Sequence, residues 1–278
     1  MPAGSSGTAR AYWDAAAGTY DRDFAGTLIG LTRREAVWRD LDRLIQPGQR
    51  ILELNCGTGI DALHLAERGV RIMACDIAPR MIDLARERVS TTKFGGAIEF
   101  RALPTEEIGK LAAEEPFDGA FSNFAGLNCV EDLAATARDL RNLIKPGGPL
   151  LVCMIGRFVP WEILWFLAHG DPARAGLRLR SGTSRAVEGG HLKVQYPSVR
   201  EIVRVFAPSF RLKRWRGIGI TVPPSYMERW ANRFPRTTRV LSGVDDWLGD
   251  LPVFRNMADS VLLTFARAEG EDLETASR

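Results

Sequence analysis

Apolar and polar positions between residues 50 and 155 follow two periods in turn. Short continuous apolar runs, typical of strands buried on both faces, are separated by stretches whose apolar residues recur every three or four positions, as on a helix. The pattern predicts strands at 50–54, 70–75, 98–103, 117–123 and 150–155, and helices at 60–68, 79–89 and 131–145. Strands that alternate with helices favour an α/β fold, a doubly wound and mostly parallel sheet covered by helices.

Beyond residue 156 the periodicity is weaker. We expect helices at 160–169 and 172–180, a glycine-rich region at 181–190, a strand at 191–196, a helix at 199–206, a strand at 211–218, a helical stretch at 226–256 and a last strand at 260–266. Seven strands fit one domain over residues 1–278. In this interpretation 50–155 form the core, 197–222 and 257–267 complete the sheet, 157–196 and 223–256 are cap segments, and helices within 1–45 pack beside them.

The charge is distributed unevenly. The chain has 37 Lys and Arg against 34 Asp and Glu, a net charge of +3, but residues 174–239 alone hold 15 basic residues against three acids. That segment therefore carries +12 and the remainder −9. A basic segment can meet an anionic substrate, a phospholipid surface or nucleic acid, although any single Arg here is more simply part of a solvated helix face.

Targeting and metal signals are absent from the sequence. The first ten residues contain no apolar run of a secretory signal, and the most apolar stretch, 150–168, carries Arg157, Pro160 and Glu162, which disfavours a membrane span. The four cysteines form no CxxC pair and have no His at ligand spacing. We therefore expect no metal site, and a reducing, cytoplasmic location.

The run Ile51-Leu-Glu-Leu-Asn-Cys-Gly-Thr-Gly-Ile-Asp-Ala62 joins a strand to a helix through a glycine turn. Gly57 and Gly59 let the backbone turn sharply and approach a ligand closely. Their spacing also satisfies a dinucleotide-binding pattern, so the glycines alone leave two cofactor classes open. Glu53 discriminates between them, because its carboxylate faces the place of a pyrophosphate and would repel it. A ligand with an ammonium and a sulfonium but no phosphate is favoured instead, which disfavours a nicotinamide-dependent oxidoreductase.

An acid ends the second predicted strand. Asp76 lies where a carboxylate can accept hydrogen bonds from both hydroxyls of a ribose, and it can equally cap the helix that begins at Pro79. Both roles are compatible, since a carboxylate has two oxygens. Ile77 and Met81 follow at positions able to sandwich an adenine ring, although by periodicity Met81 is equally a core residue.

Four blocks together resemble the class I S-adenosylmethionine methyltransferases. They are Glu53-Leu-Asn-Cys-Gly-Thr-Gly59, Asp76-Ile-Ala-Pro-Arg-Met81-Ile-Asp-Leu-Ala85, Phe117-Asp-Gly-Ala-Phe-Ser122 and Leu143-Ile-Lys-Pro-Gly-Gly148. The resemblance, of the small-molecule type, implies S-adenosylmethionine as cofactor and the strand order 3-2-1-4-5-7-6 with strand 7 antiparallel. It further implies contacts to the methionine moiety from residues 53–59, with Asn55 and Cys56 among them, and to the ribose from Asp76.

The same resemblance gives roles to four positions. Ser122 and Asn123 are expected near the transferring methyl, and Tyr20-Asp21 resembles the segment with which the N-terminal helices close over the cofactor. Two departures stand out. Asn55 replaces the usual Gly, which it can do because Asn tolerates left-handed backbone. The usual acid after the third strand is missing, so the backbone of Ala102 and Leu103, or Glu106, would have to receive the adenine amino group.

No general base is evident. Displacement at a sulfonium has a good leaving group, so positioning and exclusion of water can supply much of the catalysis. His169 and His191 could each reach a substrate hydroxyl, and are the catalytic candidates, although a structural role is the commoner one for such residues. Cys129, which follows the fourth strand, is most simply a small buried thiol.

The cap gives the clue to the acceptor. Aromatic and aliphatic residues crowd one short segment (Phe158, Trp161, Leu164, Trp165 and Phe166) beside the arginine cluster. We expect a small lipophilic or aromatic acceptor, possibly anionic, methylated on oxygen, nitrogen or carbon, and possibly a peripheral contact with a membrane. An RNA or DNA methyltransferase is the alternative, disfavoured because Ser122-Asn123-Phe124 lacks the Asn-Pro-Pro-aromatic pattern. A member of the fold that binds the cofactor without transferring methyl also remains open.

Overall fold

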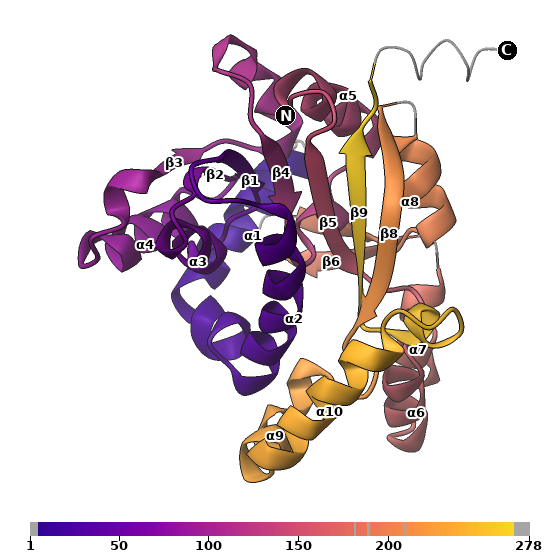
Figure 1. Ribbon diagram of the computed structural model, residues 1–278. Coiled ribbons are helices and arrows are strands. Elements are labelled where there is room, and N and C mark those ends of the chain that lie inside the picture. The colour runs from indigo at the N-terminus through magenta and orange to yellow at the C-terminus, as the bar shows by residue number, and fades with distance from the viewer. Residues whose placement is uncertain (1–4, 181, 188–189, 208, 270–278) are drawn as a thin grey trace, which may run out of the picture.

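A single seven-stranded sheet runs through the computed structural model, which describes residues 5–180, 182–187, 190–207 and 209–269 (Figure 1). Its strands are β1 Arg50–Leu54, β2 Arg71–Asp76, β3 Ile98–Ala102, β4 Gly119–Ser122, β5 Pro149–Ile155, β8 Phe210–Ile218 and β9 Ser260–Arg267. They lie in the order β3-β2-β1-β4-β5-β9-β8, and β9 runs antiparallel to both of its neighbours. When the two strands of a separate hairpin are left out of the count, this is the expected order 3-2-1-4-5-7-6.

Helices cover both faces of the sheet. The elements are α1 Ser5–Tyr20, the π-helical turn η1 Asp21–Ala25, α2 Leu28–Leu44, α3 Ile60–Glu67, α4 Pro79–Ser90, the 3-10 segment η3 Thr105–Ala113, α5 Leu133–Leu143 and α8 Val199–Phe206. One core packs the sheet against η3, α5 and α8, and a second packs it against α2, α3 and α4. The result is a three-layer α/β arrangement.

The alternation of side chains along β1 determines what faces the second core. Leu52 and Leu54 belong to the core under α5, whereas Ile51 belongs to the core under α2 and α3. Because side chains alternate along a strand, Glu53 also points to the side of α2 and α3. The carboxyl group of Glu53 thus lies in an apolar layer, where the side chains around it determine its pKa and its hydrogen bonding.

The cap departs from the sequence prediction in three places. It contains α6 Pro160–Ala168, α7 Pro172–Ala175, η5 Leu177–Leu179, β6 Gly182–Val187, β7 Gly190–Gln195, η6 Ser225–Met227, α9 Glu228–Arg233, α10 Pro235–Leu248 and η7 Phe254–Met257. The helix expected at 172–180 is wrong beyond Ala175, because Gly176 ends it and a 3-10 turn follows. The glycine-rich region instead holds β6, which pairs antiparallel with β7. The helical stretch at 226–256 is divided at Phe234, whose backbone leaves the helical region before Pro235.

Much of the basic segment is paired with acids elsewhere in the chain. Arg178 bonds to Glu162 and Asp259, and Arg214 bonds to Asp40 at 2.8 Å. The Arg214–Asp40 pair ties β8 to α2, and Arg178 ties the cap to Asp259 just before β9, so part of the charge asymmetry holds the structure together. Among the described helices, none is long and apolar enough to cross a membrane.

Candidate functional site

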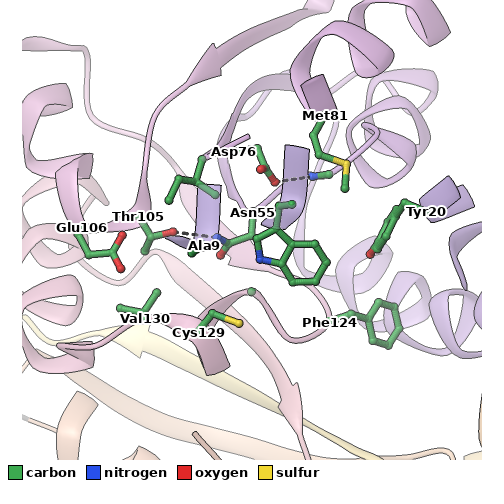
Figure 2. A pocket seen from close by; sticks show the side chains of 14 residues that line it. Ala9, Tyr20, Asn55, Asp76, Met81, Thr105, Glu106, Phe124, Cys129 and Val130 are labelled. Carbon is green, nitrogen blue, oxygen red and sulfur yellow. Dashed lines mark hydrogen bonds between the residues drawn. The ribbon is translucent and has the colours of Figure 1, made fainter. Parts of the chain in front are cut away.

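A pocket that is open to solvent lies at the carboxyl ends of β1, β2 and β4 (Figure 2). It is lined by Ala9, Trp13, Tyr20, Asn55, Gly57, Asp76, Ile77, Met81, Thr105, Glu106, Phe124, Gly126, Cys129 and Val130. Six of the predicted site residues therefore meet at one cavity, in the crevice where parallel α/β sheets bind ligands.

The glycine turn after β1 adopts backbone that other residues rarely take. Gly57 and Gly59 have φ of 54° and 73°. A Cβ on Gly59 would lie 2.9 Å from the side chain of Ala85 and 3.1 Å from Phe100. Glycine at 59 is thus required both by its conformation and by the close approach of α4 and β3.

Asp76 holds this turn in place. One carboxylate oxygen accepts a hydrogen bond from the backbone N–H of Gly57 at 2.9 Å, and the other accepts one from Ala78 at 2.9 Å (Figure 2). Burial raises the pKa of this carboxyl, and the two backbone N–H groups act in the opposite direction. The residue therefore lines the pocket and holds the chain before α4, but it does not cap that helix, whose N-cap is Ala78 without a side-chain hydrogen bond. Its contact with a ribose stays a prediction.

Asn55 takes the left-handed conformation, with φ of 57°, that its place in the turn demands. Its amide donates to Oγ1 of Thr105 at 3.0 Å and its carbonyl accepts from Oγ of Ser122 at 3.1 Å (Figure 2). The expectation that Asn can replace Gly here is confirmed, and the side chain also links β1 to β4 and η3. Ser122, predicted near the methyl, is buried behind Asn55 and does not line the pocket.

Backbone strain in the described chain is concentrated at this pocket. Its non-glycine residues with positive φ are Asn55, Phe124 (43°) and Ala125 (60°). Such conformations cost free energy and cluster at functional sites. Phe124 lines the cavity between Arg34 and Phe24, with the guanidinium of Arg34 5.3 Å from its ring centroid. Phe124 is not predictable as a site residue from the sequence, because nothing in its local pattern predicts a strained loop.

Glu53 lies beneath the glycine turn with 1% of its surface exposed. Its Oε2 has no hydrogen-bond partner among the described residues. Burial, reinforced by the nearby Asp61, raises its pKa well above the ordinary range, and Arg34 opposes that shift. A buried carboxyl oxygen without a partner is the kind of group that an incoming cation satisfies.

A polar cluster from α2, α3 and β4 surrounds this carboxyl. Asp61 forms a buried ion pair with Arg34 and accepts hydrogen bonds from Nε1 of Trp38 at 2.6 Å and from Nδ2 of Asn123 at 3.1 Å. The amide oxygen of Asn123 has no partner in the described part of the chain. Asn123 is thus fixed by Asp61, beside Phe124, rather than by a contact of its own with the pocket.

The N-terminal segment closes over the turn. A Cβ on Gly57 would lie 3.6 Å from the Tyr20 ring, and burial raises the pKa of Tyr20 to about 12. Its neighbour Asp21 accepts a hydrogen bond from Oγ1 of Thr58 at 2.6 Å and forms an ion pair with Arg88 of α4. The Tyr20-Asp21 pair therefore lies against the glycine turn.

Most of the remaining candidates, Glu53, Gly59 and Asn123 among them, do not line the cavity. Cys56 is buried under the turn, and Ala102 and Leu103 do not line the pocket, whereas Glu106 and Cys129 do. His169 is exposed at the end of α6, stacked on Trp165 and bonded to its backbone oxygen at 2.8 Å, which gives a catalytic role no geometric support. The side chain of His191 lies outside the described residues. Over those residues no cluster could hold a metal ion.

The aromatic residues of the cap also do not line the pocket. Phe158, Trp161, Leu164 and Trp165 are exposed on and around α6. Other side chains that the sequence did not single out take their place: Ala9, Trp13, Thr105, Phe124, Gly126 and Val130. The only available signal for Trp13 was an apolar position near Tyr20, in a helix that closes on the site through tertiary packing.

Comparisons with known proteins agree with this geometry. Residues 51–148 match a family model described as a methyltransferase domain. The chain is 27% identical over 162 residues to the tRNA 5-carboxymethoxyuridine methyltransferase of Escherichia coli (strain K12), covering 57% of each chain. It is 31% identical over 118 residues to the ubiquinone biosynthesis O-methyltransferase of Xanthomonas euvesicatoria pv. vesicatoria (strain 85-10), covering 41% of this chain and 46% of that one. The chain thus spans about half the length of the curated relatives it matches.

The fold is similar to that of the CcbJ methyltransferase from Streptomyces caelestis. The TM-score is 0.61 at 18% sequence identity, and the superposition covers 93% of this chain and 98% of the other. An identity this low bears on the fold alone. Because the superposition covers 93% of this chain, the similarity of fold includes the cap as well as the core. It says nothing about the acceptor.

Proposed function

We propose that this chain, whose residues 51–148 form a class I S-adenosylmethionine-dependent methyltransferase domain, transfers a methyl group to a small lipophilic or aromatic acceptor. S-adenosylmethionine is the cofactor of this domain class, and it supplies a methyl group on a positively charged sulfur. The observation that carries the proposal is the unpaired, buried Oε2 of Glu53 beneath the glycine turn.

The charges around the turn support this cofactor over a dinucleotide. Glu53 and Asp76 both face the turn, and the pKa of each is raised by burial, so each gains from a nearby cation. A pyrophosphate would add negative charge where two acids already lie. An ammonium with a sulfonium satisfies the carboxyl of Glu53 without that repulsion.

The chain's own residues account for binding and orientation. The carboxylate of Asp76 retains lone pairs for ribose hydroxyls, and Ile77 and Met81 offer apolar surface to a flat ring at the same end of the pocket. Glu106 and Thr105 lie within that lining, and we propose them, instead of Ala102 and Leu103, as polar neighbours of the ring. Asn123 and Phe124 would flank the opposite end, where the methyl is transferred.

No base is needed for this scheme. Tyr20, with a pKa of about 12, stays protonated near neutral pH and can donate a hydrogen bond but not accept a proton. We propose that Tyr20 and the N-terminal segment exclude water and orient the acceptor, with displacement at sulfur driven by alignment. An acceptor that ionises by itself, such as a phenol, fits this arrangement.

Calorimetry and a transfer assay test the proposal. The protein should bind S-adenosylmethionine and not the nicotinamide dinucleotides, and Glu53→Gln should weaken that binding by about tenfold or more, one lost charge-assisted contact. Radiolabelled methyl should appear in phenolic or quinol acceptors offered as a panel. Binding of the dinucleotide instead, or labelling confined to hydrophilic amines, contradicts the proposal. Cofactor binding without any consumption favours a member that transfers nothing.

A second candidate is methylation of tRNA. The similarity to the Escherichia coli enzyme and the exposed arginines of α9 and α10, Arg229, Arg233, Arg236 and Arg239, favour it. Retention of tRNA on a filter, decreasing steeply with salt, together with label in the RNA would establish it over a small acceptor. Failure to retain tRNA even at low salt would remove it.

A further inference from the structure

The exposed apolar side chains of this protein are concentrated in its cap. Of the large hydrophobic residues that are exposed in the described chain, all but Leu31 and Leu44 lie between residues 158 and 254. Single exposed hydrophobics are ordinary, but a concentration of this kind marks a binding surface. The cap therefore carries a function that the pocket, lined by other residues, does not explain.

Two helices present most of this surface. On α10, Val240, Val244 and Trp247 recur at the spacing of one helix face, and on α6 Trp161, Leu164 and Leu167 recur every three residues. Their exposed fractions range from 38% to 69%. We call these six residues the docking face. Leu and Val side chains at such exposure leave apolar surface in water that burial against a partner would stabilise.

The docking face lies at the same edge of the sheet as the pocket. Helix α6 follows the carboxyl end of β5, and η6 and α9 follow the carboxyl end of β8, which is parallel to β5. The rings of Trp165 and Phe166 pack against Tyr226 of η6 at 5.6 and 5.8 Å between centroids. Helices α6, α9 and α10 accordingly protrude together beyond one end of the sheet (Figure 1).

Positive charge accompanies the apolar face. Arg229, Arg233, Arg236 and Arg239 are exposed on α9 and α10, and none has a carboxylate partner in the part of the chain that the structure describes. The acids of these helices are occupied inward. Glu228 accepts the backbone N–H groups of Leu28 and Ile29, Asp245 accepts those of residues 220–222, and Asp246 pairs with Arg39 and Arg216. What remains outward is cationic.

We propose that the docking face binds the surface of a bilayer rich in anionic phospholipids. Trp and aliphatic side chains enter the boundary between headgroups and acyl chains, and neighbouring arginines meet the phosphates. Nucleic acid fits this face less well, because Leu and Val offer nothing to phosphates or base edges. A second copy fits less well too, because a two-fold interface would bring the four arginines against their equivalents.

Docking would bring the carboxyl edge of the sheet, and the pocket with it, to the lipid. A lipophilic acceptor could then pass from the bilayer to the site without crossing water. This consequence rests on the proposed function, whereas the docking itself does not. A failure of docking and a failure of methyl transfer are therefore separate results.

Sedimentation with vesicles tests the docking. We expect the purified protein to pellet with vesicles of phosphatidylcholine and phosphatidylglycerol, to pellet poorly with phosphatidylcholine alone, and to be released by salt. Trp247→Glu with Leu164→Glu, and separately Arg233→Glu with Arg236→Glu and Arg239→Glu, should each lower retention by about tenfold or more. Leu44→Glu on α2 and Arg138→Glu on α5 carry the same changes at exposed sites away from the face, and should pellet like the parent.

Circular dichroism and the affinity for S-adenosylmethionine should be unchanged in all variants, since no altered residue lines the pocket. Equal retention of parent and face variants, or no retention on anionic vesicles, overturns the proposal. Self-association in solution that Trp247→Glu abolishes, without vesicle binding, assigns the face to a second copy. Retention of tRNA that the arginine variants abolish, again without vesicle binding, assigns it to RNA.

Discussion

Glu53 is stable in the folded chain chiefly in its neutral form. Burial, followed by the proximity of Asp61, raises its pKa, so ionising it in the folded state costs more than in the unfolded state. Its contribution to stability is therefore full below the unfolded pKa and is lost as the pH rises through the folded pKa. A bound cation reverses the balance by favouring the ionised form.

We therefore expect Glu53→Gln to have opposite effects on stability and on binding. Without cofactor, the free energy of unfolding of the parent should fall between pH 5 and pH 8 as Glu53 ionises. In the variant, which has no carboxyl at this position, the fall should be smaller by about 1–3 kcal/mol. With cofactor, the variant should gain far less in melting temperature. Urea denaturation at the two pH values measures the first effect and thermal melts the second. Glu67→Gln, at an exposed acid of α3 that does not line the pocket, is the control. Parallel pH curves for the parent and Glu53→Gln would refute the idea.

The strained turn at 124–125 depends on the absence of a side chain at Gly126. A Cβ there would lie 2.3 Å from the side chain of Asn55, which is itself held by Thr105 and Ser122. We expect Gly126→Ala to destabilise the protein by about 1–3 kcal/mol, as overpacking does, and to weaken cofactor binding. Gly243→Ala in α10, where a Cβ meets nothing within 4 Å, should instead stabilise by about 0.5–1 kcal/mol. Denaturation midpoints of the two variants compare them directly, and equal midpoints would show that Asn55 can move aside.

At the scale of elements, one carboxylate anchors the N-terminal segment to the cofactor turn. Asp21 joins η1 to Thr58 in the turn and to Arg88 of α4. We expect Asp21→Ala to raise the KM for S-adenosylmethionine about three- to tenfold, because the lost hydrogen bonds contribute about 1 kcal/mol. The same variant should be cleaved faster by protease within residues 1–27. Asp23→Ala, at an exposed acid whose partners are the nearby Arg22 and Thr19 rather than the cofactor turn, should change neither. A KM unaltered in Asp21→Ala would mean that the segment closes without this anchor.

The elements that the sequence predicts well are those whose pattern reports burial. The strands and helices between 50 and 155 agree with prediction to within a few residues, because a buried parallel sheet leaves continuous apolar runs. β6 was missed because Gly-Thr-Ser-Arg-Ala-Val carries no such run, and its pairing with β7 is what makes it a strand. The helix at 172–180 failed at Gly176, where a C-terminal glycine overrides the apolar spacing.

The residues of the site likewise divide into those that local sequence predicts and those that only tertiary packing brings to the pocket. Gly57, Asp76 and Asn55 were predictable, because a tight turn and a strand-end acid leave their mark on local sequence. Trp13, Thr105 and Phe124 reach the pocket from α1, from η3 and from the turn after β4, through packing over long sequence separations. The aromatic cap was expected to line an acceptor pocket and instead faces outward, since hydrophobic composition predicts a contact but not with what.

For the whole molecule, the uneven charge along the chain is part of the architecture. Asp40 of α2 is buried and accepts from Arg214 and Arg216 of β8, while Asp246 of α10 pairs with Arg216 and with Arg39 of α2. Asp40 of α2 and Asp246 of α10 thus neutralise arginines of β8 at the edge of the sheet. The exposed arginines of α9 and α10, which have no such partner among the described residues, are those proposed to meet lipid.

Removing the buried acid at the centre of this network should therefore be costly. Asp40→Ala leaves Arg216, which is as buried as its partner, with Asp246 as its remaining carboxylate, and we expect a loss of about 1–3 kcal/mol in the free energy of unfolding. Asp250→Ala removes the exposed partner of the same Arg214, and should cost less than about 1 kcal/mol. Urea denaturation measures the free energy of unfolding of both variants. High salt should reduce the loss caused by Asp250→Ala but not the loss caused by Asp40→Ala, because ions screen exposed pairs far more than buried ones. Equal losses in the two variants would mean that water reaches Arg216, and that the basic segment is neutralised at the surface rather than in the core.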